Sequence, residues 1–176
     1  MDRTRSENRP LVLVTLFGGG WHRETYRILE QFPTDEFAFA YVYGHHSGVH
    51  GAADDPMPHP GPCYPIHYLG PTRKHPLRFF SNTARLALSI IESVRLVRRL
   101  RPHAILALGT ATAIPLFMAG KLFRVPCVFV ESLTRVEQMS LTGRILYRLR
   151  LADRFYVQWA GLQQKFDRAI YAGAVI

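Results

Sequence analysis

The chain has 176 residues, of which 48% are hydrophobic, so it is long enough to bury one sizeable core and predicts a single domain. Its formal net charge is +9, which indicates an anionic partner such as a phosphate, nucleic acid or an acidic membrane face. Arginine carries most of this charge. Its planar fork suits phosphate recognition, although a biased genome composition would produce the same excess.

Several classes of protein are excluded at once. The cysteines Cys63 and Cys127 have no CxxC spacing, which excludes a disulfide framework or zinc site and predicts a reducing compartment. The polar N-terminus is not a signal peptide. The longest uncharged stretch, 104–120, is too short and too interrupted for a transmembrane helix.

Strand and helix patterns alternate along the chain. Apolar β-branched or aromatic runs predict strands at 11–17, 37–43, 103–109, 125–131, 154–159 and 170–176, with a short additional one near 66–69. Helical periodicity predicts helices at 21–31, 79–101, 114–123, 143–151 and 162–169. This alternation predicts an α/β fold, a Rossmann-like parallel sheet with helices on both faces. We expect one domain at 11–176 after a flexible polar tail at 1–10.

Residues 44–75 interrupt this rhythm, because prolines, glycines and histidines predict an irregular loop there. The loop contains residue types that bind metals: His45, His46, His50, Asp54, Asp55 and His59. Gly48 and Gly51 argue against a helix that would place two of these histidines on one face. We therefore favour a flexible surface loop and predict no metal site.

The expected helix at 79–101 is strongly basic. Its apolar residues have core spacing, and most of its arginines lie elsewhere around the helix. A basic amphipathic helix is typical of one that rests on an anionic membrane. A core helix with a solvated charged face is the alternative, and the residues alone slightly favour it.

Small, polar and charged residues follow the predicted strands. Parallel sheets bind ligands outside the carboxyl ends of their strands, where loops and helix N-termini direct their amides outward. The residues in these positions are Gly18, Gly19, Gly20, His22, Thr110, Glu131, Ser132, Arg135, Gln158 and Trp159. Together they predict one site along one edge of the sheet.

Each part of this edge has a chemical interpretation. The three glycines and the helix start after them suit a phosphate or pyrophosphate, and His22 can act as a base or a hydrogen-bond donor. Glu131 follows an apolar strand that would hold it rigidly, and Arg135 can bind phosphate or pair with Glu131. The alternatives are an ordinary turn for the glycines and a helix cap for the glutamate.

A dinucleotide-binding enzyme is disfavoured. The segment GGGWHRE lacks the third glycine of the GxGxxG fingerprint, and FAFAYVYGHH ends without the acidic residue that would hold ribose hydroxyls.

Four motifs in residues 131–176 are more specific: E-S-x-x-R, S-L-T-G, A-D-x-F and V-Q-W. In this order they resemble the C-terminal part of an oligosaccharide-biosynthesis family. The family includes the bacterial polysaccharide subunits called PssD and CpsF, and the eukaryotic membrane-anchoring subunit of a two-protein N-acetylglucosaminyltransferase that acts on dolichol-linked sugars. RPHAILALGTATAIP and GGGWH are similar to earlier motifs of the family.

The resemblance implies the N-terminal half of a GT-B glycosyltransferase, whose C-terminal half is a separate small subunit that carries most of the nucleotide-sugar site. It implies a UDP-sugar as substrate, a polyprenyl-diphosphate-linked acceptor and no cofactor. The absence of a DxD motif agrees with catalysis without a metal. Two positions depart from the family: Trp21 stands where glycine is usual, which narrows the pocket or offers a stacking face, and His103 stands where aspartate is usual, with little expected effect.

These inferences predict a peripheral subunit on the cytoplasmic face of the membrane, acting in capsule or exopolysaccharide biosynthesis. The expected diphosphate ligands are Gly18, Gly19, Gly20, Thr110 and Arg135, and the candidate catalytic bases are His22 and Glu131, unless the partner supplies the base. The residues expected to face the partner or substrate are Ser132, Thr142, Gln158 and Trp159. The alternative is a non-catalytic scaffold that anchors and activates its partner. Nucleic-acid binding is disfavoured because the sequence has no RNA-reading motif.

Overall fold

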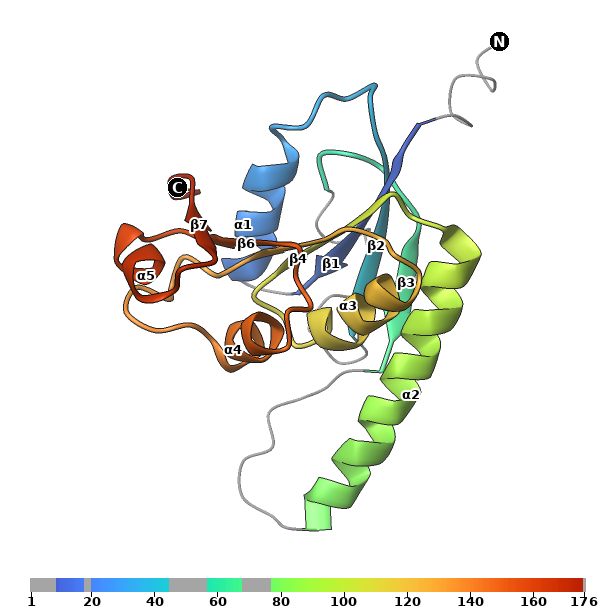
Figure 1. The fold of residues 1–176 in the computed structure, drawn as a ribbon. Coiled ribbons are helices and arrows are strands. Elements are labelled where there is room, and N and C mark those ends of the chain that lie inside the picture. Colours follow the sequence, from blue (N-terminus) through green and yellow to red (C-terminus); the bar gives the residue numbers. More distant parts are fainter. Residues whose placement is uncertain (1–8, 18–19, 45–56, 68–76, 176) are drawn as a thin grey trace.

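One parallel sheet organises the described part of the chain (Figure 1). The computed structural model describes residues 9–17, 20–44, 57–67 and 77–175, with the backbone alone for 77–84. The sheet has seven strands in the order β3-β2-β1-β4-β5-β6-β7. The strands are β1 (Leu11–Leu16), β2 (Ala38–Gly44), β3 (Cys63–Ile66), β4 (Ala104–Leu108), β5 (Cys127–Val130), β6 (Arg154–Val157) and β7 (Ala169–Tyr171). The predicted Rossmann-like α/β fold is confirmed.

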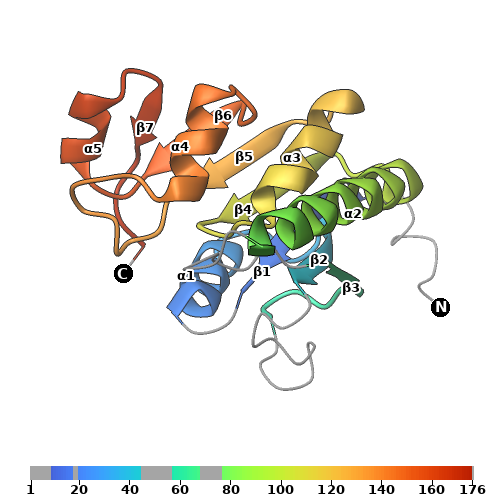
Figure 2. The ribbon, with the colours of Figure 1, turned by 90° about the horizontal axis from the view of Figure 1, so that it is seen from below.

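Helices cover both faces of this sheet (Figure 2). The helices are α1 (Gly20–Leu29), α2 (Leu77–Leu100), α3 (Ala113–Leu122), α4 (Leu141–Arg148) and α5 (Ala160–Lys165). From β1 the chain moves one way to β2 and β3, and from β4 to β7 it moves the other way. Because such crossovers are right-handed, α1 covers one face and α2 to α5 cover the other.

Each face has its own apolar core, and β1 contributes to both. Leu13 packs with Phe117 and Leu146 on the side of α3 and α4. Val14 packs in the second cluster with Leu29 of α1. A strand that is buried on both faces is nearly continuous in apolar residues, which explains the run LVLVTL of β1, where Thr15 is the one polar residue.

Helix α2 is the longest element, with 24 residues. It packs on α3, and its Ser89 and Ser93 are fully buried, so small side chains lie where the helix meets its neighbours. Figure 1 shows its first turns projecting beyond the sheet. In the segments that the structure describes, no helix combines the length and apolar character needed to span a membrane.

The predicted element boundaries need small corrections. The helix expected at 143–151 begins at Leu141, because Ser140 caps it by accepting the Gly143 N–H at 2.9 Å. The helix expected at 162–169 ends at Lys165, since the chain then enters the edge strand β7. The short strand expected at 66–69 lies instead at Cys63–Ile66, where it pairs with the apolar strand β2.

Part of the proline-rich loop is packed and not a flexible surface segment. His59 is buried, and its Nε2 lies 2.9 Å from the Leu29 carbonyl oxygen, while its ring stacks on Phe39 at 4.6 Å. The Tyr41 hydroxyl donates to the His59 carbonyl at 2.6 Å. His59 is thus a core residue. The other five candidate metal ligands lie outside the described residues, as does the tail at 1–8.

Candidate functional site

The candidate site lies at the point where the strand order reverses. Strands β1 and β4 are neighbours, but their connections leave in opposite directions, which opens a crevice at their carboxyl ends. Gly20 begins α1 after β1, and Gly109 follows β4. Glu131 and Gln158 follow β5 and β6 at the same edge. The structure therefore brings the predicted residues of four strand ends to one edge, while Gly18 and Gly19 lie outside the described part.

Glu24 of α1 is the centre of a buried polar network at this edge. Its side chain is 9% exposed. One carboxylate oxygen accepts the Ser132 hydroxyl at 3.0 Å, and the other accepts the Leu133 N–H and the Gln158 amide, each at 3.0 Å. These donors come from the loop after β5 and from the end of β6. One carboxylate on α1 thus binds two segments that lie more than 100 residues later in the chain.

Glu131 joins the beginning and the end of the loop after β5, at Ser132 and Ser140. Its carboxylate is fully buried and accepts the Ser132 N–H at 3.1 Å, the Ser140 N–H at 2.9 Å and the Ser140 hydroxyl at 3.0 Å. A Cβ at Gly143 would lie 2.2 Å from this carboxylate. The motifs E-S-x-x-R and S-L-T-G are therefore one structural unit: Ser140 caps α4, and Gly143 leaves room for the Glu131 carboxylate.

The electrostatics of Glu131 follow from this burial. Loss of water raises the pKa of its carboxyl, while the hydrogen bonds from Ser140 and Ser132 and the charge of Arg135 act in the lowering direction. Arg135 makes no ion pair with Glu131 within the part of the chain that is described. In this conformation Glu131 has no exposed surface through which to meet a substrate.

Gln158 and Trp159 connect β6 to the loop. The Gln158 amide donates to Glu24 and to the Glu131 carbonyl, each at 3.0 Å, and its oxygen accepts the Val175 N–H at 2.8 Å. The Trp159 indole donates to the Leu133 carbonyl at 2.7 Å. Gln158 is therefore an internal connector.

Of the four residues expected to face a partner or substrate, Trp159 is exposed, at 36%. Ser132, Thr142 and Gln158 are buried. The Ser132 hydroxyl and the Gln158 amide find partners inside the chain, on Glu24, and Thr142 is buried in the first turn of α4.

The Trp21 side chain packs against Gly109, the first residue after β4. Gly109 has φ +54°, and a Cβ added there would lie 2.7 Å from the Trp21 Nε1. The Trp21 ring meets Phe17 edge-on at 5.1 Å. Its buried indole N–H has no hydrogen-bond acceptor among the residues that the structure describes. Trp21 therefore requires glycine at position 109, which explains the glycine of the G-T-A-T segment.

The remaining predicted residues differ in how far they are exposed. His22 is buried, at 7% exposure, on the first turn of α1. Thr110 is also buried, and its hydroxyl lies 2.6 Å from that of Thr112. Arg135 is exposed, and its backbone N–H donates to the Ser132 carbonyl at 2.9 Å. Arg135 and the exposed Gly20 therefore offer surface groups for an anion.

An open apolar hollow of about 380 Å³ adjoins Gln158 on the α1 side of the sheet. Ile28, Val128 and Tyr156 contribute to its walls, with the segment 172–175 beside them. Exposed apolar hollows of this kind are common at binding surfaces.

Sequence reasoning missed Glu24. The helical pattern at 21–31 contained a signal for it, because Glu24 lies one turn before Ile28 and beside Thr25 on the face that packs on the sheet. A carboxylate on a core-facing stripe requires partners. Those partners come from distant loops, which no local pattern reveals.

The fold and this edge define a class of domain, the Rossmann-like domain of GT-B glycosyltransferases. The structure is similar to that of MurG from Acinetobacter baumannii, with a TM-score of 0.68, 14% identity, and coverage of 94% of this chain and 45% of that one. It is also similar to UDP-GlcNAc 2-epimerase from Methanocaldococcus jannaschii, with a TM-score of 0.64, 9% identity, and coverage of 93% and 45%. At these identities the likeness concerns the fold.

The chain belongs to the family described as oligosaccharide biosynthesis protein Alg14 like, whose model matches residues 12–175. It is 33% identical over 119 residues to the UDP-N-acetylglucosamine transferase subunit ALG14 of Rattus norvegicus, which covers 64% of this chain and 54% of that protein. It is 39% identical over 102 residues to the subunit of the same name from Yarrowia lipolytica, covering 54% and 46%. The chain thus spans about half the length of these relatives.

Proposed function

We propose that this chain is the acceptor-binding, membrane-associating subunit of a two-component glycosyltransferase. The proposed reaction transfers a sugar from a UDP-sugar to a polyprenyl-diphosphate-linked acceptor. The relatives' names favour N-acetylglucosamine as that sugar. The observation that carries the proposal is the loop 131–135, which Glu24, Glu131 and Gln158 fix at the switch point of the family's fold.

The acceptor diphosphate would bind between the start of α1 and this loop. Helix N-termini attract phosphates because their first N–H groups lack partners within the helix. Arg135 supplies a fork of donors beside it. Thr110, whose hydroxyl lies beside that of Thr112, is a further proposed ligand. Gly18 and Gly19 are proposed ligands from the sequence alone.

The attacking hydroxyl of the acceptor needs a base that it can reach. The Glu131 carboxylate is fully buried and already accepts three hydrogen bonds, which favours a positioning role for it. We therefore propose His22, or a group of the partner subunit, as the base. The general prediction that His22 or Glu131 acts as base is tested by the experiment below.

The proposed partner is a small subunit that resembles the C-terminal half of a GT-B enzyme and holds the nucleotide sugar. The exposed Trp159 and the apolar hollow beside Gln158 are the proposed contact surfaces. We propose that α2 contacts the cytoplasmic face of the membrane. On this helix Leu88 and Ile91 are each 46% exposed, and Arg95 follows one turn later. The family description supports oligosaccharide biosynthesis, and a capsule or exopolysaccharide product stays a prediction.

The test is co-expression with the small subunit, followed by transfer of labelled N-acetylglucosamine from its UDP conjugate to a synthetic polyprenyl-diphosphate acceptor. We expect Arg135→Ala to raise the KM for the acceptor about tenfold or more and to leave the complex intact. We expect His22→Ala to lower kcat by 10² or more if it is the base. Arg144→Ala is a matched control, because Arg144 is an exposed arginine that bonds Gln138 at 2.8 Å.

The scaffold alternative gives a different pattern. If His22→Ala, Glu131→Ala and Arg135→Ala all leave transfer at the wild-type rate, while Trp159→Ala abolishes the complex, this chain only anchors and activates its partner.

A further inference from the structure

Three helices of this chain end in the same unusual way. The residues after α2, α3 and α4 are Arg101, Arg124 and Arg150, with φ of 47°, 58° and 52°. This left-handed conformation favours glycine, because a Cβ crowds the backbone there. All three arginines lie at the edge where β4, β5 and β6 begin, which is opposite the candidate site.

Two of these arginines line a hollow between the ends of α2 and α3. The hollow has a volume of about 540 Å³. Its lining includes Arg98, Arg101, Arg124, His103 and Phe123, and it includes no aspartate or glutamate. In the structure the guanidinium groups of these three arginines make no hydrogen bond or ion pair with any described residue. The hollow therefore collects uncompensated positive charge.

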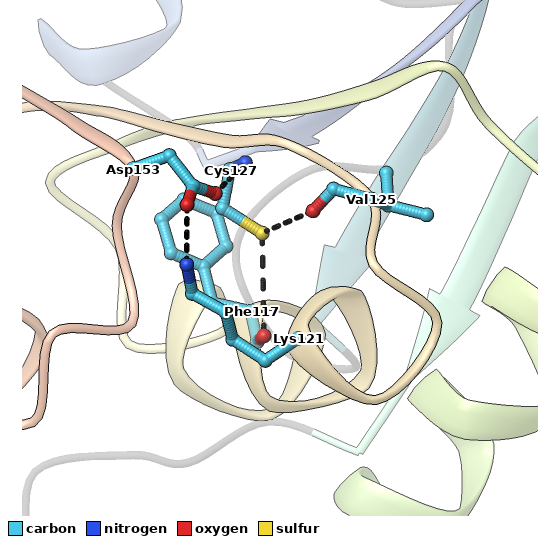
Figure 3. A network of polar contacts seen from close by, with 5 residues as sticks. All are labelled: Phe117, Lys121, Val125, Cys127 and Asp153. Carbon is cyan, nitrogen blue, oxygen red and sulfur yellow. Dashed lines mark hydrogen bonds and ion pairs between the residues drawn. The ribbon is translucent and has the colours of Figure 1, made fainter.

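The neighbouring acid and the carbonyls at the end of α3 already have other partners. Figure 3 shows Lys121 paired with Asp153, at 2.5 Å, and the other oxygen of Asp153 accepting the Cys127 N–H at 2.8 Å. The last carbonyls of α3 accept the Arg124 N–H at 3.3 Å and the Val125 N–H at 2.8 Å. This acid and these carbonyls are thus engaged and leave the arginines without a partner.

His103 adds a donor of fixed orientation. Its Nδ1 accepts the Leu11 N–H at 3.1 Å, so the neutral ring carries its hydrogen on Nε2. The polar side chains of the hollow are therefore donors: three guanidinium forks and an imidazole N–H. Phe123, with Val97 beside it, adds an apolar wall.

We propose that this hollow binds a phosphate ester, with the phosphate on Arg98, Arg101 and Arg124 and the organic group against Phe123. A phosphate offers acceptor oxygens that match several arginine forks at once. The hollow is larger than a bare phosphate needs, which favours an ester. The ester can belong to an anionic lipid headgroup or to a soluble phosphorylated compound. This hollow lies at the opposite edge of the sheet from the candidate glycosyltransferase site, and its proposed ligand does not depend on the glycosyltransferase function.

The positive φ of these arginines allows the charge to be removed without strain on the backbone. Replacing Arg101 or Arg124 by glycine removes the cation and at the same time relieves the backbone. Arg150→Gly is the matched control, because Arg150 ends α4 with the same pattern of capping hydrogen bonds as Arg124 but lies outside the hollow. Thermal unfolding of the full chain should show all three variants at least as stable as the wild type.

Two probes distinguish the sources of the ester. Titration with glycerol 3-phosphate tests a soluble ligand, and co-sedimentation with phosphatidylglycerol vesicles, against phosphatidylcholine vesicles, tests a headgroup. We expect Arg101→Gly and Arg124→Gly each to weaken binding of one of these probes about tenfold or more, and Arg150→Gly to weaken it much less.

Binding of the soluble probe with this pattern supports a soluble ligand, and the same pattern with vesicles alone supports a headgroup. The proposal is wrong if the wild type binds neither probe. It is equally wrong if the three variants lose the same amount, because the attraction is then a general effect of net charge.

Discussion

Replacing Glu24 by alanine tests the buried network most directly. The change removes both carboxylate oxygens from three donors: the Ser132 hydroxyl, the Leu133 N–H and the Gln158 amide. Two of these donors keep a second contact. Ser132 lies 3.1 Å from the Thr134 hydroxyl, and Gln158 still reaches the Glu131 carbonyl.

The uncompensated loss is therefore mainly the Leu133 N–H. A half-buried donor without a partner costs about 1–3 kcal/mol, and the two weakened charge-assisted bonds add to this. We expect Glu24→Ala to lower the free energy of unfolding by about 2–3 kcal/mol. Glu24→Gln should cost about 1 kcal/mol, because its oxygen can accept two of the donors and its amide can donate to the serine hydroxyl.

The assay is urea unfolding of the full chain at neutral pH, followed by far-UV circular dichroism. Glu30→Ala is the control: Glu30 follows α1, and among the described residues its side chain pairs with Arg27 at the surface, at 3.1 Å, so its loss should stay within about 0.5 kcal/mol. A Glu24→Ala variant as stable as Glu30→Ala would refute the reasoning, since the network would then hold nothing in place.

Three other predictions concern the same framework. Gly109→Ala should destabilise the fold by about 2 kcal/mol and shift tryptophan fluorescence, because the new Cβ meets Trp21 in a left-handed backbone; unchanged fluorescence would contradict this packing. Iodoacetamide should label the half-buried Cys63 in the native chain and spare Cys127, where burial raises the pKa of the thiol to about 12; equal native rates would count against it. Burial acts to raise the pKa of Asp153, but the hydrogen bonds from Lys121 and the Cys127 N–H lower it overall. Its folded pKa therefore lies below the unfolded one, so its stabilisation is complete above about pH 4 and is lost as the pH falls through the folded pKa. The melting temperature of Asp153→Asn should lie furthest below that of the wild type at pH 7 and approach it at pH 3; a constant gap would argue against this linkage.

The fold could be predicted because its signal is local. The apolar runs of β1, β4 and β5 are buried on both faces, so they read as strands without any knowledge of their neighbours. The packed part of the proline-rich segment could not be predicted. His59 is buried by Leu29 and Phe39, which belong to other elements, and its own neighbours in sequence resemble a surface loop.

The candidate site could be predicted as a place but not as a mechanism. Strand ends of a parallel sheet meet at one edge, so Glu131, Ser132 and Gln158 were expected near one another. Whether a side chain points outward to a ligand or inward to a neighbour depends on partners from other segments. Glu131 points inward because Ser140 and Gly143, nine and twelve residues later, complete a pocket for its carboxylate.

The sequence by itself determined the parallel sheet, the edge at which the unusual residues gather and the excess of arginine, because periodicity, strand ends and charge are written in order along the chain. The tertiary structure alone decided that Glu24 anchors the loop after β5 and that Arg98, Arg101 and Arg124 surround one hollow. Both facts depend on contacts between segments distant in sequence, and the packing of the helices on the sheet creates those contacts.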